Sequence, residues 1–300
     1  MRNFDELITK TRSQKSLSRL VIAAAEDIHA IEAAIAAKKL SLAEPLYVGD
    51  ETKIRKIFND LNLIQPESEF VFNVPDPKEA SRKAVELVHQ GKADFLMKGA
   101  VDSKIYLGAV VDKQSGLSTE RLMSHFSILE IPGYHKLIAP VDGGMVPYPD
   151  LEQKKDIIQN SVDVFHKLGY AEPKVAVLAC TEKVNPKMPE TLDAEALTQM
   201  NKNGEICGCI IEGPVSYDCA MSKEIAYEKG YNSKISVDVD ILVAPNIHAG
   251  NIMGKIFTVT CQAKMAGIIV GAGCPIVMTS RASSAEEKLL SIALASIVAR

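Results

Sequence analysis

Near its C-terminus the chain carries Pro275-Ile276-Val277-Met278-Thr279-Ser280-Arg281-Ala282-Ser283-Ser284, a stretch that joins two contrasting patterns. Its first four residues form an apolar run of strand length, and residues 284–298 are apolar at helical spacing. A buried strand followed by a polar loop and an amphipathic helix is the building unit of α/β proteins. This stretch therefore predicts an α/β fold and places a polar loop at the end of one of its strands.

The same alternation continues back along the chain. Several of the apolar runs are continuous rather than alternating, which is typical of parallel strands buried on both faces. The other predicted strands are Leu20–Ala24, Leu46–Val48, Phe70–Val74, Phe95–Met97, Val175–Ala179, Cys209–Ile211, Ile241–Ala244 and Gly267–Val270. The other predicted helices are Asp27–Ala37, Thr52–Leu61, Lys78–His89, Leu151–Leu168, Ala194–Lys202 and Ser222–Glu228. Together they predict an α/β architecture with mainly parallel sheets.

Composition sets broad limits on what the protein does. The chain has 300 residues, 47% of them hydrophobic, which is enough for one large unit or two domains. A formal net charge of -4 argues against a nucleic-acid partner. No apolar segment is long enough to span a membrane and the N-terminus lacks a signal-peptide pattern, so we expect a cytoplasmic protein. The six cysteines match no zinc or haem spacing, and we expect buried, reduced thiols.

Proline and glycine mark the expected domain boundary. The segment 140–149 begins and ends with proline and contains Gly143 and Gly144, so it predicts a crossing between two domains. Asp150 is a suitable N-cap for the helix that follows.

The loop that contains Ser280 and Arg281 is the strongest candidate site. Open α/β sheets bind ligands at the carboxyl ends of their strands, and a guanidinium group matches phosphate oxygens in a bidentate manner. We therefore predict an anion site with both side chains in it. Ser284 and Glu287 form a capping-box pattern, so capping and chemistry remain alternative roles for Glu287.

Other loops carry weaker signals. Lys98 ends a predicted strand, Gly213 and Pro214 predict a turn after another, and Asn251 and Lys255 lie four residues apart on one helix face. Adjacent strand residues point to opposite faces, so Ser124 and His125 do not predict a hydrolase pair, and no G-x-S-x-G motif exists. The chain has no phosphate-binding P-loop, no complete G-x-G-x-x-G motif and no metal-ligand pattern.

The ordered set of motifs resembles the phosphate acetyl/butyryltransferase family. The most specific parts are the segment 182–194, which contains Lys-Val-Asn-Pro-Lys-Met-Pro, and Thr279-Ser280-Arg281. The other parts are Lys98-Gly99, residues 121–125, Gly213-Pro214 with Asp218, and residues 249–252. The resemblance covers nearly the whole chain. The short length and the two specific segments are closer to phosphate butyryltransferase than to phosphate acetyltransferase.

The resemblance implies a fold similar to that of isocitrate and isopropylmalate dehydrogenases, with two α/β domains beside a cleft, in a homo-oligomer. Domain I would comprise residues 1–139 and 265–300, and domain II residues 140–264. The implied reaction transfers an acyl group, butyryl favoured, between coenzyme A and inorganic phosphate. It requires no metal and no redox cofactor, and we expect functional coupling to an acyl kinase.

The resemblance also implies roles for individual residues. Arg281 would bind phosphate, Ser280 would donate to the phosphate or oxyanion, and Glu287 would hold the position of the base, where acetyltransferases typically have aspartate. The expected phosphate- and coenzyme A-binding residues are Lys98, Arg121, Ser124, Asn185, Pro186, Gly213, Pro214, Asn251 and Lys255. Acetyltransferases carry an arginine near residues 100–108 that is absent here, and Lys98 or Arg121 would supply its charge.

Three alternatives stay open at this point. A phosphate acetyltransferase would differ in its acyl pocket. A nicotinamide-dependent decarboxylating dehydrogenase on the related fold would need an aspartate cluster for its metal, which the sequence does not show. A non-catalytic acyl-CoA or metabolite-binding protein would release no thiol.

Overall fold

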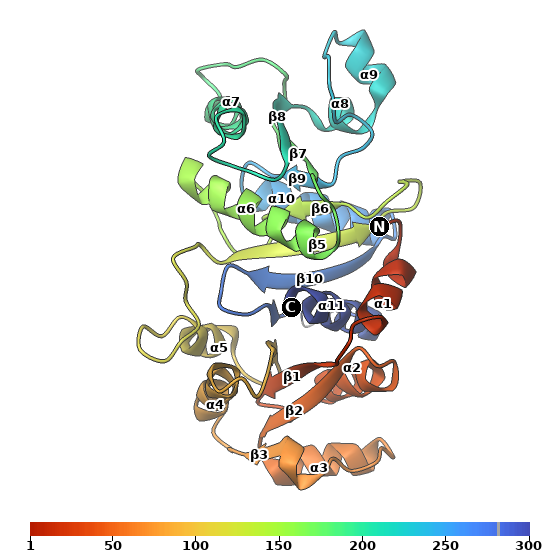
Figure 1. Ribbon diagram of the computed structural model, residues 1–300, viewed down its shortest axis with the longest axis vertical. Helices are drawn as coiled ribbons and strands as arrows, with labels where there is room; N and C mark the ends of the chain where they lie inside the picture. Colours follow the sequence, from red (N-terminus) through yellow and green to blue (C-terminus); the bar gives the residue numbers. More distant parts are fainter. Residues whose placement is uncertain (281–282) are drawn as a thin grey trace. The chain divides into compact units, whose positions relative to one another are not determined.

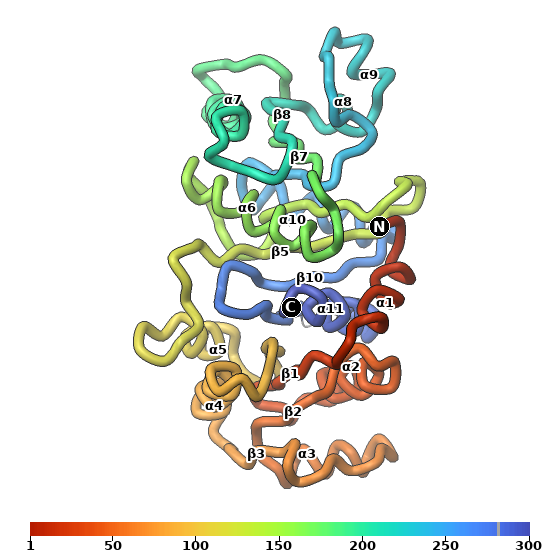
Figure 2. Tube along the Cα trace, in the orientation of Figure 1, coloured from red at the N-terminus to blue at the C-terminus, as the bar shows by residue number. Residues whose placement is uncertain are grey.

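The computed structural model describes residues 1–280 and 283–300, and the chain divides into two compact units. Unit 1 comprises Met1–Asn3 and Leu122–Met265, and unit 2 comprises Phe4–Arg121 and Ala266–Arg300. The C-terminal segment thus returns to the N-terminal part of the chain to complete unit 2, as the red and blue tube of that unit shows (Figure 2).

Unit 2 is built on a mostly parallel sheet with the strand order β3-β2-β1-β4-β11-β10. Its strands are β1 (Ser18–Ala23), β2 (Ala43–Gly49), β3 (Val71–Asn73), β4 (Phe95–Lys98), β10 (Lys264–Val270) and β11 (Ile276–Val277). The part of β10 from Ala266 onward belongs to unit 2. Its helices are α1 (Phe4–Arg12), α2 (Ile28–Lys39), α3 (Glu51–Asp60), the 3-10 turn η1 (Ser68–Phe70), α4 (Pro77–His89), α5 (Ser103–Val110) and α11 (Ala285–Val298). In Figure 1, α4 and α5 lie on one side of β1 and β2, and α2 and α11 lie on the other.

Hydrogen bonds from buried hydroxyl groups hold α11 inside unit 2. Ser18 donates to the Ser296 carbonyl at 3.0 Å, and Ser296 donates to the Leu42 carbonyl at 2.8 Å. Thr11 of α1 donates to the Ala293 carbonyl at 3.3 Å. These contacts join residues more than 250 positions apart, so α11 packs against α1, α2 and the sheet.

Unit 1 contains a four-stranded parallel sheet with the order β6-β9-β7-β8. Its strands are β5 (Ser124–Glu130), β6 (Ala139–Val141), β7 (Lys174–Leu178), β8 (Ile210–Val215) and β9 (Ile241–Val243). Its helices are α6 (Leu151–Lys167), α7 (Pro189–Lys202), α8 (Tyr217–Met221), α9 (Lys223–Glu228), α10 (Ile247–Lys255) and the π-helical turn η2 (Ile256–Thr260). A cluster of buried apolar side chains, including Leu129, Ala176, Val215 and Leu242, forms its core.

The predicted fold class is confirmed, whereas the predicted domain boundary is wrong. The α/β class with mainly parallel sheets is confirmed, and Asp150 caps α6 in a complete capping box with Gln153. The expected crossing at 140–149 is wrong, because the chain passes between the units at Arg121/Leu122. Residues 122–139 belong to unit 1, since β5 meets Ile138 through Leu129 and Ser127 donates to the Pro140 carbonyl at 2.8 Å. The return lies at Met265/Ala266.

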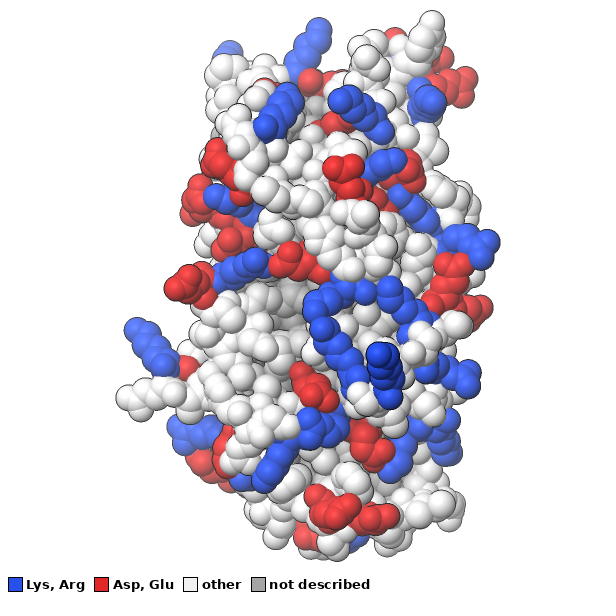
Figure 3. All heavy atoms as spheres, in the orientation of Figure 1, with Lys and Arg blue, Asp and Glu red and all other residues white. Residues whose placement is uncertain are grey.

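Charged side chains of both signs are interspersed over the face that Figure 3 draws. Among the described residues, no helix is both long enough and apolar enough to cross a lipid bilayer.

Candidate active site

Lys98 and Ser280 leave the unit 2 sheet at the same edge. Strand β11 runs parallel to β4, with Val277 beside Met97, so the residues after both strands emerge together. The chain builds β1, β2 and β3 outward on one side of β1 and then returns to β4 on the other. The carboxyl ends of β1 and β4 are thus the topological switch point, where α/β sheets place ligands. Lys98 Nζ donates there to the carbonyls of Gly99 at 3.2 Å and Val101 at 2.9 Å.

The N-terminus of α11 follows this loop. Arg281 lies outside the described residues. Ser284 caps α11 by accepting from the Glu287 backbone N–H at 3.1 Å. The Glu287 carboxylate accepts from the Ser283 hydroxyl at 2.6 Å, which differs from the expected capping-box contact with the backbone of Ser284. Lys288, which the sequence did not single out, is buried and donates to the Ser283 carbonyl at 3.0 Å.

Arg121 and Ser124, two candidate residues close to the point where the chain passes from unit 2 to unit 1, have different environments. Arg121 is exposed, and its backbone N–H donates to Thr119 Oγ1 at 3.1 Å. Ser124 is only 1% exposed, and its hydroxyl accepts from the Asn160 amide at 3.0 Å. Protein atoms therefore enclose the Ser124 side chain, and its role in substrate binding stays a prediction.

A buried aspartate organises the loop after β6. Asp142 Oδ1 accepts from the backbone N–H groups of Gly144 at 2.7 Å and Met145 at 2.8 Å, and Oδ2 accepts from the His125 N–H at 2.8 Å. The Asn251 amide donates to the Gly143 carbonyl at 3.0 Å, so this predicted binding residue also fastens the loop to α10. Asp142 is not among the residues predicted from the sequence, where its one signal is an aspartate directly before two glycines.

Small residues allow α10 to approach this loop. A side chain on Gly250 would collide with the Asp142 carbonyl oxygen, so only glycine fits at this position of α10. Lys255 ends the same helix one turn after Asn251, as expected. The imidazole of His125 is half-buried, and burial lowers its pKa; the Asp142 carboxylate opposes this effect and the Lys255 ammonium adds to it.

The candidate binding residues Asn185 with Pro186 and Gly213 with Pro214 lie in segments of different form. Asn185 lies in an exposed loop, where its side chain accepts from the Lys187 N–H at 3.0 Å, and Pro186 is its neighbour. Gly213 and Pro214 belong to β8 itself, which contradicts the predicted turn. A Cβ atom on Gly213 would lie 2.8 Å from Val177 Cβ, so this glycine serves the packing of β8 on β7.

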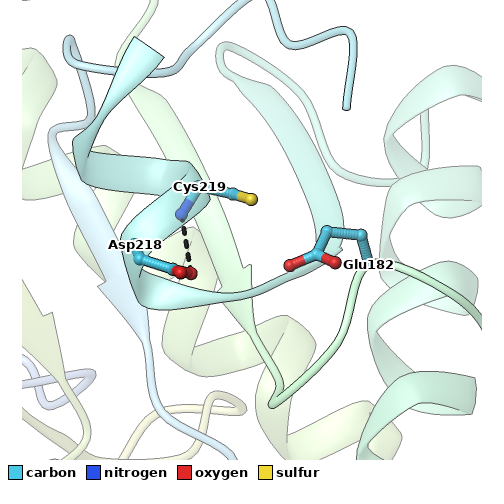
Figure 4. Close-up of side chains that lie close together, drawn as sticks. All are labelled: Glu182, Asp218 and Cys219. Atoms are coloured by element: carbon cyan, nitrogen blue, oxygen red, sulfur yellow. Dashed lines mark hydrogen bonds between the residues drawn. The ribbon is translucent and has the colours of Figure 1, made fainter. Parts of the chain in front are cut away.

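An ion cluster connects the loops that follow β7 and β8. Figure 4 shows Glu182, Asp218 and Cys219 directed toward one another. The Ser216 hydroxyl contacts both Glu182 and Asp218, and Lys229 Nζ lies 2.9 Å from Asp218 Oδ2 and 3.5 Å from Glu182 Oε1. Because the Lys229 ammonium already balances the negative charge here, we interpret the cluster as a structural clasp, meaning a set of ion pairs and hydrogen bonds that holds the segment after β7 to the segment after β8.

This clasp gives a pH-dependent contribution to stability. Hydrogen bonds from Lys229 and Ser216 lower the pKa of Asp218 from 3.8 to about 2. A lowered carboxyl pKa stabilises the fold above the unfolded value and loses that effect as pH falls through the folded value. We expect wild type to exceed Lys229→Gln in unfolding free energy by a constant amount above about pH 5, with most of the difference lost by about pH 2. Urea denaturation from pH 2 to 7 measures it, and a pH-independent difference would contradict the assignment.

An apolar pocket of about 390 Å³ lies at the carboxyl ends of β7 and β9. These strands are the switch point of the unit 1 sheet, because the chain continues from β7 to β8 on one side and then to β9 on the other. Its lining includes Leu178, Cys180, Met188, Tyr217, Ala249 and Met253. The pocket thus joins residues from, or directly beside, the segments 182–194, 213–218 and 249–252, which the sequence analysis had singled out separately.

Comparison with known proteins identifies the family. A family model described as "Phosphate acetyl/butaryl transferase" matches residues 76–296. The chain belongs to this family. It is 42% identical to a phosphate butyryltransferase of Clostridium acetobutylicum, over 100% of this chain and 99% of the relative. It is 41% identical to a phosphate acetyltransferase of Thermotoga maritima, over 94% of this chain and 95% of the relative.

A solved structure agrees with this assignment. The crystal structure of a branched-chain phosphotransacylase from Enterococcus faecalis has a TM-score of 0.81 to this chain at 28% identity. The match covers 94% of this chain and 99% of that one, so family and fold rest on nearly the whole length.

Proposed function

We propose that this protein catalyses the reversible transfer of a short-chain acyl group between coenzyme A and inorganic phosphate. The observation that carries the proposal is the full-length similarity to a phosphate butyryltransferase and a phosphate acetyltransferase, at 42% and 41% identity. Both names describe acyl transfer to phosphate, so the reaction class is common to them and the acyl chain is the point of difference.

The chemistry is a displacement at a carbonyl carbon. In one direction the thiolate of coenzyme A attacks the acyl phosphate, a C–S bond forms, and the C–O bond to phosphate breaks with release of inorganic phosphate. A base accepts the thiol proton, since the thiolate is the nucleophile. Negative charge develops on the carbonyl oxygen and on the departing phosphate, and fixed donors lower the barrier. Coenzyme A and phosphate are substrates, and the reaction needs no metal or redox cofactor.

The roles of the unit 2 residues follow the motif. We assign phosphate binding to Arg281 and a donor role to Ser280, with Lys98 supplying further positive charge. The support is that Lys98 and the segment ending at Ser280 leave parallel neighbouring strands at one sheet edge. For Glu287 two roles compete, because its carboxylate is held by Ser283 at 2.6 Å while its backbone N–H takes part in the cap.

The direct test of the function is phosphate-dependent release of thiol across a series of acyl-CoA esters. We expect release that requires phosphate, with kcat/KM higher for butyryl-CoA than for acetyl-CoA. A higher kcat/KM for acetyl-CoA would make the protein a phosphate acetyltransferase. Nicotinamide reduction with a 2-hydroxy acid and magnesium would instead favour the dehydrogenase alternative. No thiol release from any short acyl-CoA would favour a binding protein.

We further propose that the pocket at the ends of β7 and β9 receives the alkyl part of the acyl group. Three observations support this role: the pocket has apolar walls, it lies at a switch point, and motif segments surround it. Its volume of about 390 Å³ leaves room for chains longer than acetyl, which is why butyryl is favoured.

Ala249 is the residue through which this pocket can be narrowed. It lies on α10 and lines the pocket, and leucine is compatible with a helix. We expect Ala249→Leu to lower kcat/KM for butyryl-CoA by about 10–100-fold, because each excluded methylene is worth roughly 1–3 kcal/mol. The value for acetyl-CoA should change much less. Parallel kinetics with both esters measure the ratio.

Ala171→Leu provides the matched control, since Ala171 is exposed in the same unit and does not line the pocket. An equal loss for both esters in Ala249→Leu would place the alkyl chain elsewhere.

We also propose a homo-oligomer, and an acyl kinase that consumes the acyl phosphate as the functional partner. An apolar stripe on α10 and η2 supports self-association: Ile252, Ile256 and Val259 are 59%, 48% and 74% exposed at successive helical turns. A monomeric mass by light scattering would reject the oligomer.

A further inference from the structure

We infer that unit 2 contains a second ligand site, for a planar aromatic molecule that carries an anionic group. The site is a pocket of about 490 Å³ between the C-terminal ends of α2 and α3. Glu44 and Pro45 at the start of β2 line it, so it lies toward the amino ends of the strands. Lys98 and Ser280 emerge at the carboxyl ends of the same parallel sheet, which makes this a site separate from the proposed chemistry.

Aromatic side chains form the inner wall of the pocket. Tyr47 and Phe58 meet edge to face with ring centroids 5.4 Å apart, and both rings are buried. Phe70, Pro66 and Leu63 add further apolar surface. The partly exposed surface of this lining comes from Phe70, Pro66 and Leu63, and it favours a flat apolar ring that packs against it.

The Tyr47 hydroxyl gives the pocket a polar centre. Tyr47 is 2% exposed, and its hydroxyl has no hydrogen-bond partner within the part of the chain that the structure describes. The hydroxyl of Tyr106 is also unpaired but is fully enclosed by protein, whereas Tyr47 lines the pocket. The hydroxyl faces the pocket, so a ligand can supply the hydrogen bond that no described side chain makes to it.

The outer edge of the pocket supplies positive charge. Lys38 Nζ lies 5.4 Å from the centroid of the Phe70 ring and forms an ion pair with Glu44 at 2.6 Å, so its charge is already balanced. Lys39, the next residue, forms no ion pair with any described side chain. An anionic group on the ligand would find its partner in Lys39, at the mouth of the pocket.

The wall opposite α2 is held in place before any ligand binds. Gln65 donates to the Arg55 carbonyl at 3.0 Å and to Asn59 Oδ1 at 2.7 Å, and Arg55 donates to the Pro66 carbonyl at 3.2 Å. The loop after α3 is thus fastened to that helix. A preformed pocket binds with less ordering of side chains, which favours affinity.

Two sources provide this ligand chemistry: a nucleotide and an aromatic acid. Isothermal titration of the whole protein with AMP and with indole-3-acetate separates them. We expect at least one probe to bind with Kd below about 1 mM, and its affinity to depend on Tyr47 and Lys39 of this pocket. Binding of AMP alone identifies a nucleotide site, and binding of indole-3-acetate alone identifies an aromatic-acid site.

Tyr47→Phe tests the polar centre because it removes only the hydroxyl and keeps the ring packed on Phe58. We expect binding at least about fivefold weaker and an unchanged melting temperature, since the hydroxyl bonds to no described side chain. Lys39→Gln should weaken binding and reduce its salt dependence. Lys113→Gln, on an exposed lysine of unit 2 away from the pocket, is the matched control.

Two results would each overturn the site: no binding of either probe at millimolar concentration, and affinity unaffected by both Tyr47→Phe and Lys39→Gln. Neither of them depends on acyl transfer, so the proposed function and the second site are tested separately.

Discussion

Arg281→Ala is expected to lower kcat/KM for phosphate-dependent thiol release from butyryl-CoA by at least about 100-fold. The guanidinium group is assigned to the phosphate and to the charge that develops on it, and removal of one such stabilising group typically costs about 10²–10³ in rate. Capping of α11 does not require this side chain, because Ser284 provides the cap. Initial-rate kinetics with varied phosphate measure the effect.

Arg281→Lys separates charge from geometry. Lysine keeps the positive charge and loses the planar bidentate match to phosphate oxygens, so an intermediate loss is expected. The thermal midpoint of both variants should stay near that of wild type. Turnover close to wild type in Arg281→Ala would remove the residue from the mechanism.

Asp142→Ala is expected to lower the free energy of unfolding by about 2–4 kcal/mol. The buried carboxylate accepts three backbone N–H groups, from His125, Gly144 and Met145, and hydrogen bonds to a charged acceptor contribute about 1.5–3 kcal/mol each. Water can replace part of this at Gly144, which is exposed, so the sum is not fully lost. Urea denaturation followed by circular dichroism measures the change.

Asp142→Asn removes only part of these hydrogen bonds and should have a smaller effect. One oxygen can still accept from Gly144 and Met145, while the new amide faces the His125 N–H, which is also a donor. A loss between wild type and Asp142→Ala is therefore expected. Stability unchanged in both variants would show that the loop after β6 does not depend on this carboxylate.

The elements were predictable because their signals are local. Buried parallel strands are continuous apolar runs, and aspartates mark the starts of helices, as Asp27, Asp50 and Asp150 do here. The helices α1 and α5 were not predicted. The crossing was misplaced because proline and glycine also mark turns within a unit, and the segment 140–149 leads from β6 to α6 inside unit 1.

The α/β class, the helix caps and the family motifs, including the loop with Ser280 and Arg281, follow from the amino-acid sequence alone. These features depend on residue type and on spacing over a few turns. The folded chain was needed to learn which candidates are enclosed, as Ser124 is by contact with Asn160, and which hold a loop, as Asn251 does through Gly143. It also decided that the segments 182–194, 213–218 and 249–252 border one pocket. The physical reason is that burial and pairing arise from contacts between distant residues, which local pattern does not encode.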